Sequence, residues 1–321
     1  MTQAMGKGGL ILAIATAVAM SIMAFLTGAT IPNGGEVGLC LPSPTDWNLL
    51  PVASWAINLA LLLLSALGLG LLNRSFSVVP GQASSTLSGL FLIMATSIPW
   101  IGGALTTSVI IAPAIMIVMA ILFGSYRQSN ATQELFAIAT ILSLGSMLQY
   151  AFLLMIVPVL VSALTFKCLR VREVIAFGMG LIAPYWVAIG FGILPLESLT
   201  MPSLTNLFAM ASHRGVLLIC LINLGFTALL SLVLALYNGV RLYAGNTRRR
   251  QFNMAVNMFG LTCLAGMVFD SSNLSAYIVT FYMSAAFQQA DLFALWHFRR
   301  PWIGALIICA LYITSFLMCV L

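Results

Sequence analysis

The feature that most constrains this chain is a series of apolar runs, each near 20 residues long, that recurs along its whole length. A helix of about 20 residues is long enough to cross the roughly 30 Å hydrocarbon core of a bilayer. Hydrophobic residues make up 61% of the 321 residues and charged residues only 6%, whereas about a quarter of the residues of a soluble domain are charged. The sequence therefore predicts an all-α polytopic transmembrane helical bundle.

About eleven spans are expected, and residues 1–321 are expected to form a single transmembrane helical domain because the runs continue without a long hydrophilic break. The pair at 134–166 has only 33 residues, which allows either two full spans or a re-entrant pair that turns near Gln149 and Tyr150. The expected spans are 8–31, 51–73, 86–104, 106–124, 134–149, 150–166, 174–194, 215–238, 252–270, 273–296 and 302–321.

Basic residues give the expected orientation, because cytoplasmic loops carry an excess of lysine and arginine. With the N-terminus in the cytoplasm, only Arg214 of the thirteen basic residues falls outside. We therefore expect a multi-pass protein of the bacterial inner (cytoplasmic) membrane with a periplasmic C-terminus. The basic residues on the cytoplasmic side are Lys7, Arg74, Arg127, Lys167, Arg170, Arg172, Arg241, Arg248, Arg249, Arg250, Arg299 and Arg300.

Several classes of function are disfavoured by what the sequence lacks. The net charge of +6 is distributed over short loops rather than one patch, so a nucleic-acid partner is not expected. The six cysteines show no CxxC or metal-ligand spacing, and most lie in apolar runs, where cysteine behaves as a small hydrophobic residue. No nucleotide, zinc-protease or nucleophile-elbow motif occurs. The sequence accordingly implies no metal site and identifies no cofactor.

Candidate site residues gather on the expected periplasmic side. The first outer loop, "GGEVGLCLPSPTDW", carries Glu36 and Asp46, and a later one, "PLESLTMPSLTNLFAMASHRG", ends in His213 and Arg214. Glu36 or Asp46 could act as general base or as a metal-phosphate ligand. Arg214 could hold a phosphate through paired hydrogen bonds, and His213 could transfer protons near neutral pH. The competing interpretation is that Arg214 binds lipid headgroups or pairs with Glu197.

Polar residues within the expected spans are few, and Asp291 is the ionisable one. It lies in "FQQADLFALWHFRR", where it could pair with the arginines that follow the span. A functional role for a charge inside the membrane is the alternative. The cluster "NTRRRQFN" (246–253) is expected to anchor the topology, or else to bind an anionic lipid or phosphorylated substrate.

One segment carries a family resemblance. "ELFAIATILSLGSMLQYAFLLMIVPVLVSALTFKCLRVREVIAFGMGLIAPYW" (134–186), with its Gly180, Pro184 and Tyr185 ending, resembles an uncharacterised polytopic integral membrane protein family of Bacteroidota, as does "LLNRSFS" (71–77). More distantly, the chain is similar to multi-span polyprenol-dependent glycosyltransferases and glycan polymerases. That similarity implies outer-face chemistry with an acid in the first outer loop, where Glu36 and Asp46 lie. The chain departs from that pattern in having no paired-acid motif and no large outer domain.

Three functional hypotheses follow. The first is a role in cell-envelope biogenesis, in which the protein handles a lipid-linked glycan or a phospholipid intermediate at the periplasmic face, as an enzyme or as a binding protein. The second is a non-enzymatic membrane subunit of an envelope assembly or secretion complex. The third is a transporter, which the shortage of ionisable groups in the spans makes less favoured. The expected partners are membrane lipids, a lipid-linked glycan and other membrane-protein subunits.

Overall fold

The computed structural model describes residues 7–28, 41–42, 44, 47–80, 84–192, 216–243, 247–270, 273–295 and 301–320. Within these ranges the regular structure is helical, with no strand, which confirms the predicted helical class. The helices are α1 (Lys7–Leu26), α2 (Pro51–Phe76), α3 (Ser84–Thr96), α4 (Pro99–Gly103), α5 (Thr107–Gly124), α6 (Thr132–Leu148), α7 (Ala151–Leu154), α8 (Ile156–Thr165), α9 (Val171–Gly190), α10 (Val216–Tyr243), α11 (Thr247–Phe269), α12 (Leu274–Leu295) and α13 (Pro301–Val320).

Seven of the described helices are long and apolar enough to cross a bilayer, and this identifies the chain as a multi-pass membrane protein. They are α1, α2, α5, α9, α10, α11 and α13. Each of the other expected spans also coincides with helix, although two of them differ from a single continuous rod. The expected span at 86–104 is divided into α3 and α4, and the one at 150–166 into α7 and α8.

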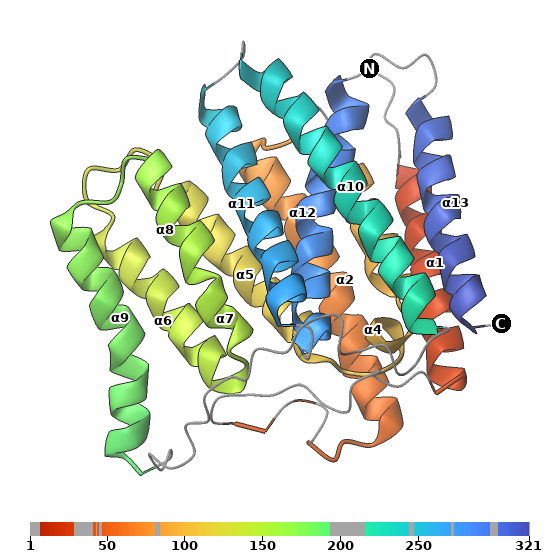
Figure 1. Cartoon of the computed structure of the whole chain (residues 1–321), viewed down its shortest axis with the longest axis horizontal. Helices are drawn as coiled ribbons and strands as arrows, with labels where there is room; N and C mark the ends of the chain where they lie inside the picture. The colour runs from red at the N-terminus through yellow and green to blue at the C-terminus, as the bar shows by residue number, and fades with distance from the viewer. Residues whose placement is uncertain are drawn as a thin grey trace.

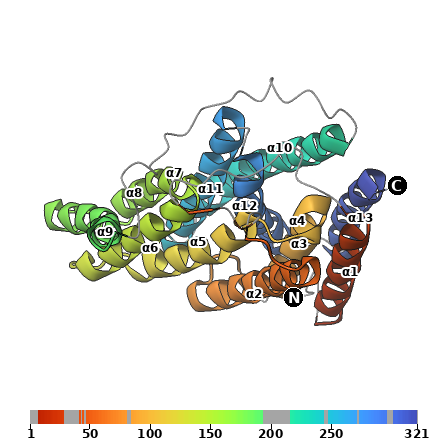
Figure 2. The ribbon, with the colours of Figure 1, turned by 90° about the horizontal axis from the view of Figure 1, so that it is seen from below.

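The helices run along a broadly common direction, as Figure 1 shows. Seen from below in Figure 2, α9 lies at one side of the molecule and α1 and α13 lie at the other, with α12 between them. The helix α12 packs against α3, α5, α10 and α11. Every residue from Leu274 to Asp291 is buried, so α12 is the central element of the bundle.

Basic residues occupy one end of this arrangement. The helices α2, α5 and α8 finish there and α9 and α11 begin there, at the upper end in Figure 1. We call this the basic end, and the other the opposite end. The described basic residues at or beside these helix ends are Arg74, Arg127, Lys167, Arg170, Arg172, Arg248, Arg249 and Arg250.

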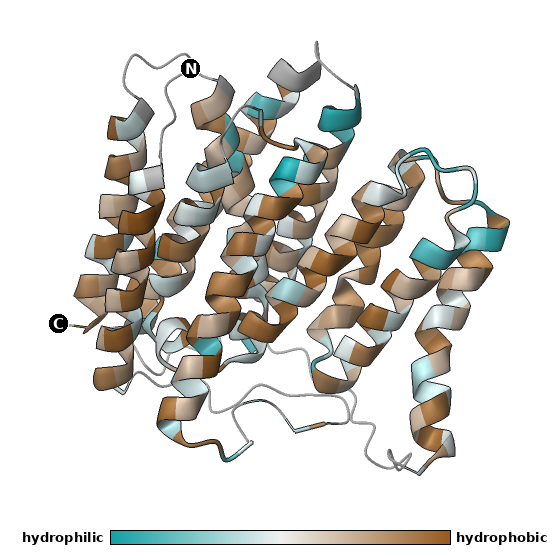
Figure 3. Ribbon diagram, turned by 180° about the vertical axis from the view of Figure 1, so that it is seen from behind, coloured by the Kyte–Doolittle hydropathy of each residue, from teal (hydrophilic) through white to brown (hydrophobic). Residues whose placement is uncertain are grey.

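The outer faces of the helices are apolar. Leu67, Met179 and Leu229 are each more than 60% exposed, and brown dominates the lengths of the helices in Figure 3. In water such exposure over many helices would be unfavourable, since burial of apolar area drives folding. In hydrocarbon it carries no such cost, and the exposed apolar faces therefore fit a lipid environment.

The break between α3 and α4 follows from Pro99. Proline has no N–H and its ring clashes with the preceding helical turn, which favours a break here, although α5 and α9 continue through Pro113 and Pro184. Ile98 is extended, with φ −100° and ψ 114°, and α4 begins at Pro99. The carbonyls of α4 are taken by neighbouring helices: Asn58 of α2 donates to the Ile101 oxygen at 2.7 Å, and Ser21 of α1 donates to the Gly102 oxygen at 2.8 Å. The broken segment is thereby fixed to α1 and α2.

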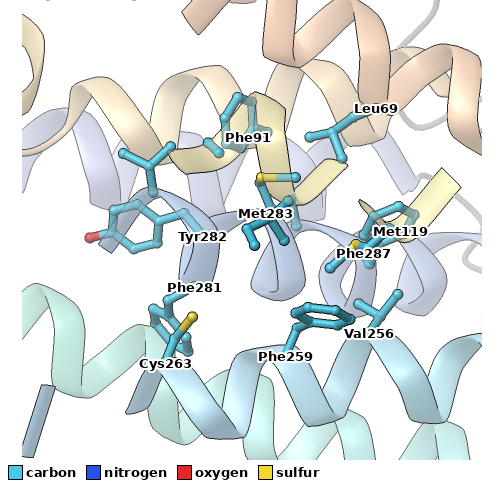
Figure 4. Packing of buried hydrophobic residues seen from close by; sticks show 14 of the residues in the cluster. Leu69, Phe91, Met119, Val256, Phe259, Cys263, Phe281, Tyr282, Met283 and Phe287 are labelled. Carbon is cyan, nitrogen blue, oxygen red and sulfur yellow. The ribbon is translucent and has the colours of Figure 1, made fainter. Parts of the chain in front are cut away.

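Close approach of α11 and α12 depends on two glycines of α11. A Cβ on Gly266 would lie 2.6 Å from the Tyr277 ring, and one on Gly260 would lie 2.4 Å from the Ser284 hydroxyl. Small residues at helix contacts allow the tight packing that joins helices in a membrane. Around the contact of α11 and α12, the apolar side chains of α12 pack between those of the neighbouring helices (Figure 4). The labelled members are Leu69, Phe91, Met119, Val256, Phe259, Cys263, Phe281, Tyr282, Met283 and Phe287.

Candidate functional site

The predicted outer-face residues Glu36, Asp46, His213 and Arg214 lie outside the described residues, as does Glu197. The described helices fix only the ends between which these segments run. The segment with Glu36 and Asp46 joins α1 to α2, and the segment with His213 and Arg214 joins α9 to α10. Those four helix termini all lie at the opposite end of the bundle, the lower end in Figure 1.

The described part of the chain holds a different candidate site, a buried ion pair near the basic end. Arg249 of α11 forms a salt bridge with Asp291 of α12, and the Asp291 side chain is fully buried. The same guanidinium donates to the Val78 carbonyl oxygen at 2.9 Å. Asn253 donates to the second carboxylate oxygen of Asp291 at 3.2 Å. Both carboxylate oxygens are therefore hydrogen-bonded, which a buried charge requires to be tolerated.

Amide side chains extend this ion pair further along α12. The Asn253 side-chain oxygen accepts from Gln288 at 3.3 Å and from Asn257 at 3.1 Å. Gln288 also donates to the Asn257 side-chain oxygen at 2.6 Å, and the Gln288 oxygen accepts from Asn238 of α10 at 3.1 Å. This amide cluster links α10, α11 and α12. Because an ionised carboxylate only accepts, the bond to Asp291 fixes which end of the Asn253 amide donates, and its side-chain oxygen is left to accept from Asn257 and Gln288.

A second polar group lies at the middle of α12. The Tyr282 hydroxyl donates to the Asn223 side-chain oxygen at 3.2 Å. The Asn223 amide in turn donates to Ser315 at 2.9 Å and to Ser97 at 3.3 Å. Asn223 therefore joins α10, α12 and α13 to Ser97, the residue at the break between α3 and α4.

The contacts of α12 with α10 and α13 continue about two turns further along the same face of α12. Gln289 donates to the Tyr312 hydroxyl at 3.1 Å, and the Tyr312 and Thr227 hydroxyls lie 2.9 Å apart. All three side chains are fully or nearly fully buried. Residues 288 and 289 of α12 thus point polar groups towards different neighbours at the same depth.

The opposite end of α12 carries a third polar group, centred on Asp270 and Asn273. The Tyr277 hydroxyl donates to one Asp270 carboxylate oxygen at 3.0 Å, and the Asn273 amide donates to the other at 3.1 Å. Asn273 also donates to the Tyr150 hydroxyl at 2.6 Å and accepts from Gln149 at 3.0 Å. The turn between α6 and α7 is thereby attached to the start of α12.

Taken together, these three groups place hydrogen-bonding side chains along the length of α12, from Asn273 to Asp291, inside an apolar shell. Buried polar groups are costly unless satisfied, and satisfied networks fix a unique arrangement of the helices. Such a row can also relay protons or coordinate a polar solute if the helices move. Among the described residues, no group of three or more His, Cys, Asp or Glu side chains could hold a metal ion.

Asp291 pairs with an arginine from another helix, and the predicted pairing with the arginines that follow the span stays a prediction. The expected partners, Arg299 and Arg300, lie outside the described residues, and the arginine that forms the salt bridge is Arg249 of the "NTRRRQFN" cluster. A sequence signal for this exists. Arg249, Asn253 and Asn257 are spaced four residues apart, which places them on one helical face.

The neighbouring Arg248 of the cluster makes a separate contact with aromatic rings. The Arg248 guanidinium lies 5.2 Å from the Phe252 ring centroid and 5.9 Å from that of Tyr126. Phe252 stacks on Phe123 at 4.5 Å, and Phe166 packs edge-on against Phe252 at 5.5 Å. Cation–π contacts of this kind are worth about 0.5–1 kcal/mol at exposed sites. The cluster therefore contributes to packing at the basic end as well as to charge.

One thiol at the basic end lies in the turn before α9. Cys168 is buried, and this burial raises the pKa of its thiol, with smaller opposing effects from a hydrogen bond to Ser125. A raised pKa keeps the thiol protonated at neutral pH, and the protonated form is the unreactive one. Cys168 therefore fits the predicted structural role.

Comparison with known proteins adds no assignment: no protein-family model matches the chain, and no match is found among the curated proteins.

Proposed function

We propose that the chain is a bacterial inner-membrane protein of cell-envelope biogenesis that handles a lipid-linked, phosphate-bearing intermediate at the periplasmic face. The observation that carries the proposal is the shared position of four helix termini. The two segments with Glu36, Asp46, His213 and Arg214 are attached at the same end of the bundle, away from the basic end. Acids, a histidine and an arginine are the residue types that bind a phosphate and transfer its protons.

The orientation in this proposal has separate support. Positively charged loops remain in the cytoplasm in polytopic proteins, and the described arginines and lysine gather at the basic end. Assigning that end to the cytoplasm places the N-terminus inside, the C-terminus in the periplasm and the four candidate residues in the periplasm. Eleven crossings are consistent with this arrangement, since each expected span coincides with helix.

Variants of the candidate residues test the proposal. Glu36→Gln, Asp46→Asn, His213→Gln and Arg214→Ala would each be expressed in a deletion strain, at matched membrane levels. Loss of a general base or acid lowers a rate about 100-fold or more. We therefore expect at least one variant to accumulate a lipid-linked glycan or phospholipid precursor, measured by mass spectrometry of lipid extracts.

The matched control is Arg170→Ala, which removes an exposed positive charge at the basic end. It should leave the lipid profile unchanged. Normal profiles in all four outer-face variants, together with normal envelope glycans, would contradict the proposal.

A second candidate function, coupled transport, is favoured by one specific observation. The Arg249–Asp291 pair lies near the basic end of α12, the central helix, and a polar row continues from it along that helix. Ionisable groups inside membrane bundles commonly serve substrate or proton pathways. The central helix would then be the moving element, since its polar partners belong to α10, α11 and α13.

Proton flux in reconstituted vesicles tests this candidate. Purified protein would be placed in liposomes that contain a pH-sensitive dye, and a potassium diffusion potential would be imposed. Coupled transport predicts that the dye reports faster acidification of the vesicle interior with the natural chain than in empty vesicles. For Asp291→Asn the rate should return to that of empty vesicles. Cys309→Ser serves as the control, because it replaces another buried side chain outside the polar row. Flux that is equal for Asp291→Asn and the natural chain would exclude a role for the pair in proton movement.

A further inference from the structure

Two cysteines 99 positions apart in the sequence meet at the contact of α10 and α13. The Sγ atoms of Cys220 and Cys319 lie 3.5 Å apart. Cys220 is buried and Cys319 is partly exposed. A disulfide has an S–S bond of about 2.05 Å, so the two sulfurs are about 1.5 Å from bonding distance.

The register of the two helices holds this pair together. Asn223 donates to Ser315 at 2.9 Å one turn further along the contact, and Thr227 meets Tyr312 at 2.9 Å one turn beyond that. The numbers rise along α10 as they fall along α13, as antiparallel helices require. The cysteine pair is therefore the outermost of three successive contacts, and its proximity is set by two hydrogen-bonded layers beneath it.

The position of the pair decides which redox environment it meets. Cys319 lies in the last turn of α13, and Cys220 lies near the start of α10. Both helix termini belong to the opposite end of the bundle (Figure 1). With the orientation given above, this end faces the periplasm, where disulfides form and persist.

We propose that Cys220 and Cys319 form a disulfide bond in the cell, which fastens α13 to α10. The proposal rests on the proposed membrane orientation and not on the lipid-linked substrate. One thiolate attacks a disulfide of a periplasmic thiol oxidase protein and forms a mixed disulfide. The second thiolate then attacks the sulfur of the first, so the S–S bond closes. The oxidase leaves as a dithiol that has taken up the two electrons and, by exchange through solvent, the two protons of the cysteine thiols.

Trapping of the thiols in cells tests the proposal. Aerobically grown cells would be quenched in acid, denatured, alkylated with N-ethylmaleimide and digested without reduction. We expect a linked peptide pair that contains Cys220 and Cys319, with no alkylation of either. Cys263 and Cys309 serve as internal controls and should be fully alkylated, since neither has a described sulfur partner within bonding reach. Full alkylation of Cys220 and Cys319 would overturn the proposal.

The purified full-length chain in detergent tests the geometry by a different route. Copper–phenanthroline should produce an intramolecular cross-link and raise the thermal unfolding midpoint by several degrees. A reductant should reverse both effects. Cys319→Ser and Cys220→Ser should abolish the shift, whereas Cys309→Ser, on the same helix, should retain it. Absence of the cross-link in the natural chain would also overturn the proposal.

Topology reporters separate a failure of this proposal from a failure of the orientation. If fusions place the C-terminus in the cytoplasm and the thiols are free in cells, both the orientation and the disulfide are wrong. If they place it in the periplasm and the thiols are free, the disulfide alone is wrong. A linked pair with a periplasmic C-terminus supports both.

Discussion

At the scale of single residues, Asp291 shows how a charge is accommodated inside a membrane bundle. Its carboxylate receives Arg249 on one oxygen and Asn253 on the other. The sequence identified Asp291 as the ionisable residue of its span and gave an arginine as its partner. It could not select Arg249, because that choice depends on where the start of α11 meets the end of α12. Contacts between residues 42 positions apart are set by tertiary packing, which local spacing does not encode.

Removal of one member of this pair should be strongly destabilising. An uncompensated buried charge costs about 3–5 kcal/mol, whereas replacement of both charges by apolar groups is often neutral. We therefore expect Arg249→Met to lower the unfolding midpoint in detergent sharply, and the double variant Arg249→Met with Asp291→Leu to recover most of the loss. Arg248→Met serves as the control, because its guanidinium contacts aromatic rings rather than Asp291. Equal destabilisation by the single and double variants would show that the pair is not the source of the effect.

A second residue-scale prediction concerns the glycines of α11. Gly266→Ala places a methyl group closer to the Tyr277 ring than a normal van der Waals contact allows, and overpacking of this kind costs about 1–3 kcal/mol. Gly225→Ala on α10 is the matched control, since a Cβ there meets nothing within 4 Å. It should stabilise by about 0.5–1 kcal/mol, because alanine favours helix over glycine. Thermal unfolding of the two variants in the same detergent measures both effects, and a tolerated Gly266→Ala would refute the close α11–α12 approach.

At the scale of elements, helix existence was predictable and helix continuity was not. The apolar runs indicated every described helical stretch, and the expected span starts at residues 134 and 174 lie in the first turns of α6 and α9. The break before Pro99 and the short α7 were missed. A proline in a membrane span can bend, break or merely perturb a helix, and which occurs depends on whether neighbours satisfy the freed carbonyls. Here Ser97 bonds the Met94 carbonyl at the end of α3, and Asn58 and Ser21 hold the following α4 by its last carbonyls.

The hydrogen bond from α2 to α4 predicts the effect of Asn58→Leu. The change removes the donor to the Ile101 carbonyl and leaves that oxygen without its partner, at a cost of about 1–3 kcal/mol. The loss should appear as a lower unfolding midpoint and faster proteolysis at the α3–α4 break. Thr314→Val is the control, since that exposed hydroxyl bonds only within its own helix. An unchanged midpoint for Asn58→Leu would show that the α4 carbonyls find other donors.

At the scale of the whole molecule, the described basic helix ends lie together at one end of the bundle, and this asymmetry predicts the orientation in the membrane. The candidate residues Glu36, Asp46, His213 and Arg214 stay predictions, because only the helix ends that flank them are described. The sequence predicts the side of the membrane on which they lie, from charge asymmetry alone. What it could not give was their mutual distance, because that depends on how far apart α2 and α9 stand in the bundle.

The orientation itself can be measured directly. Alkaline phosphatase fused after Ser129, at the basic end, should be inactive, and the same enzyme fused after Gly192 should be active, because it folds only in the periplasm. A fluorescent-protein fusion at each position should give the reverse pattern. The reverse result in both pairs would invert the orientation and move the candidate residues to the cytoplasm.

The burial of α12 has a further consequence for the order in which the chain is built. This helix is not among the seven described helices that are long and apolar enough to cross a bilayer, and Asp291 near its end opposes insertion further. Its partners Asn238, Arg249 and Asn253 are all synthesised before it. During translation α12 is therefore expected to leave the translocon as a unit with α11, which is synthesised first and carries Arg249 and Asn253.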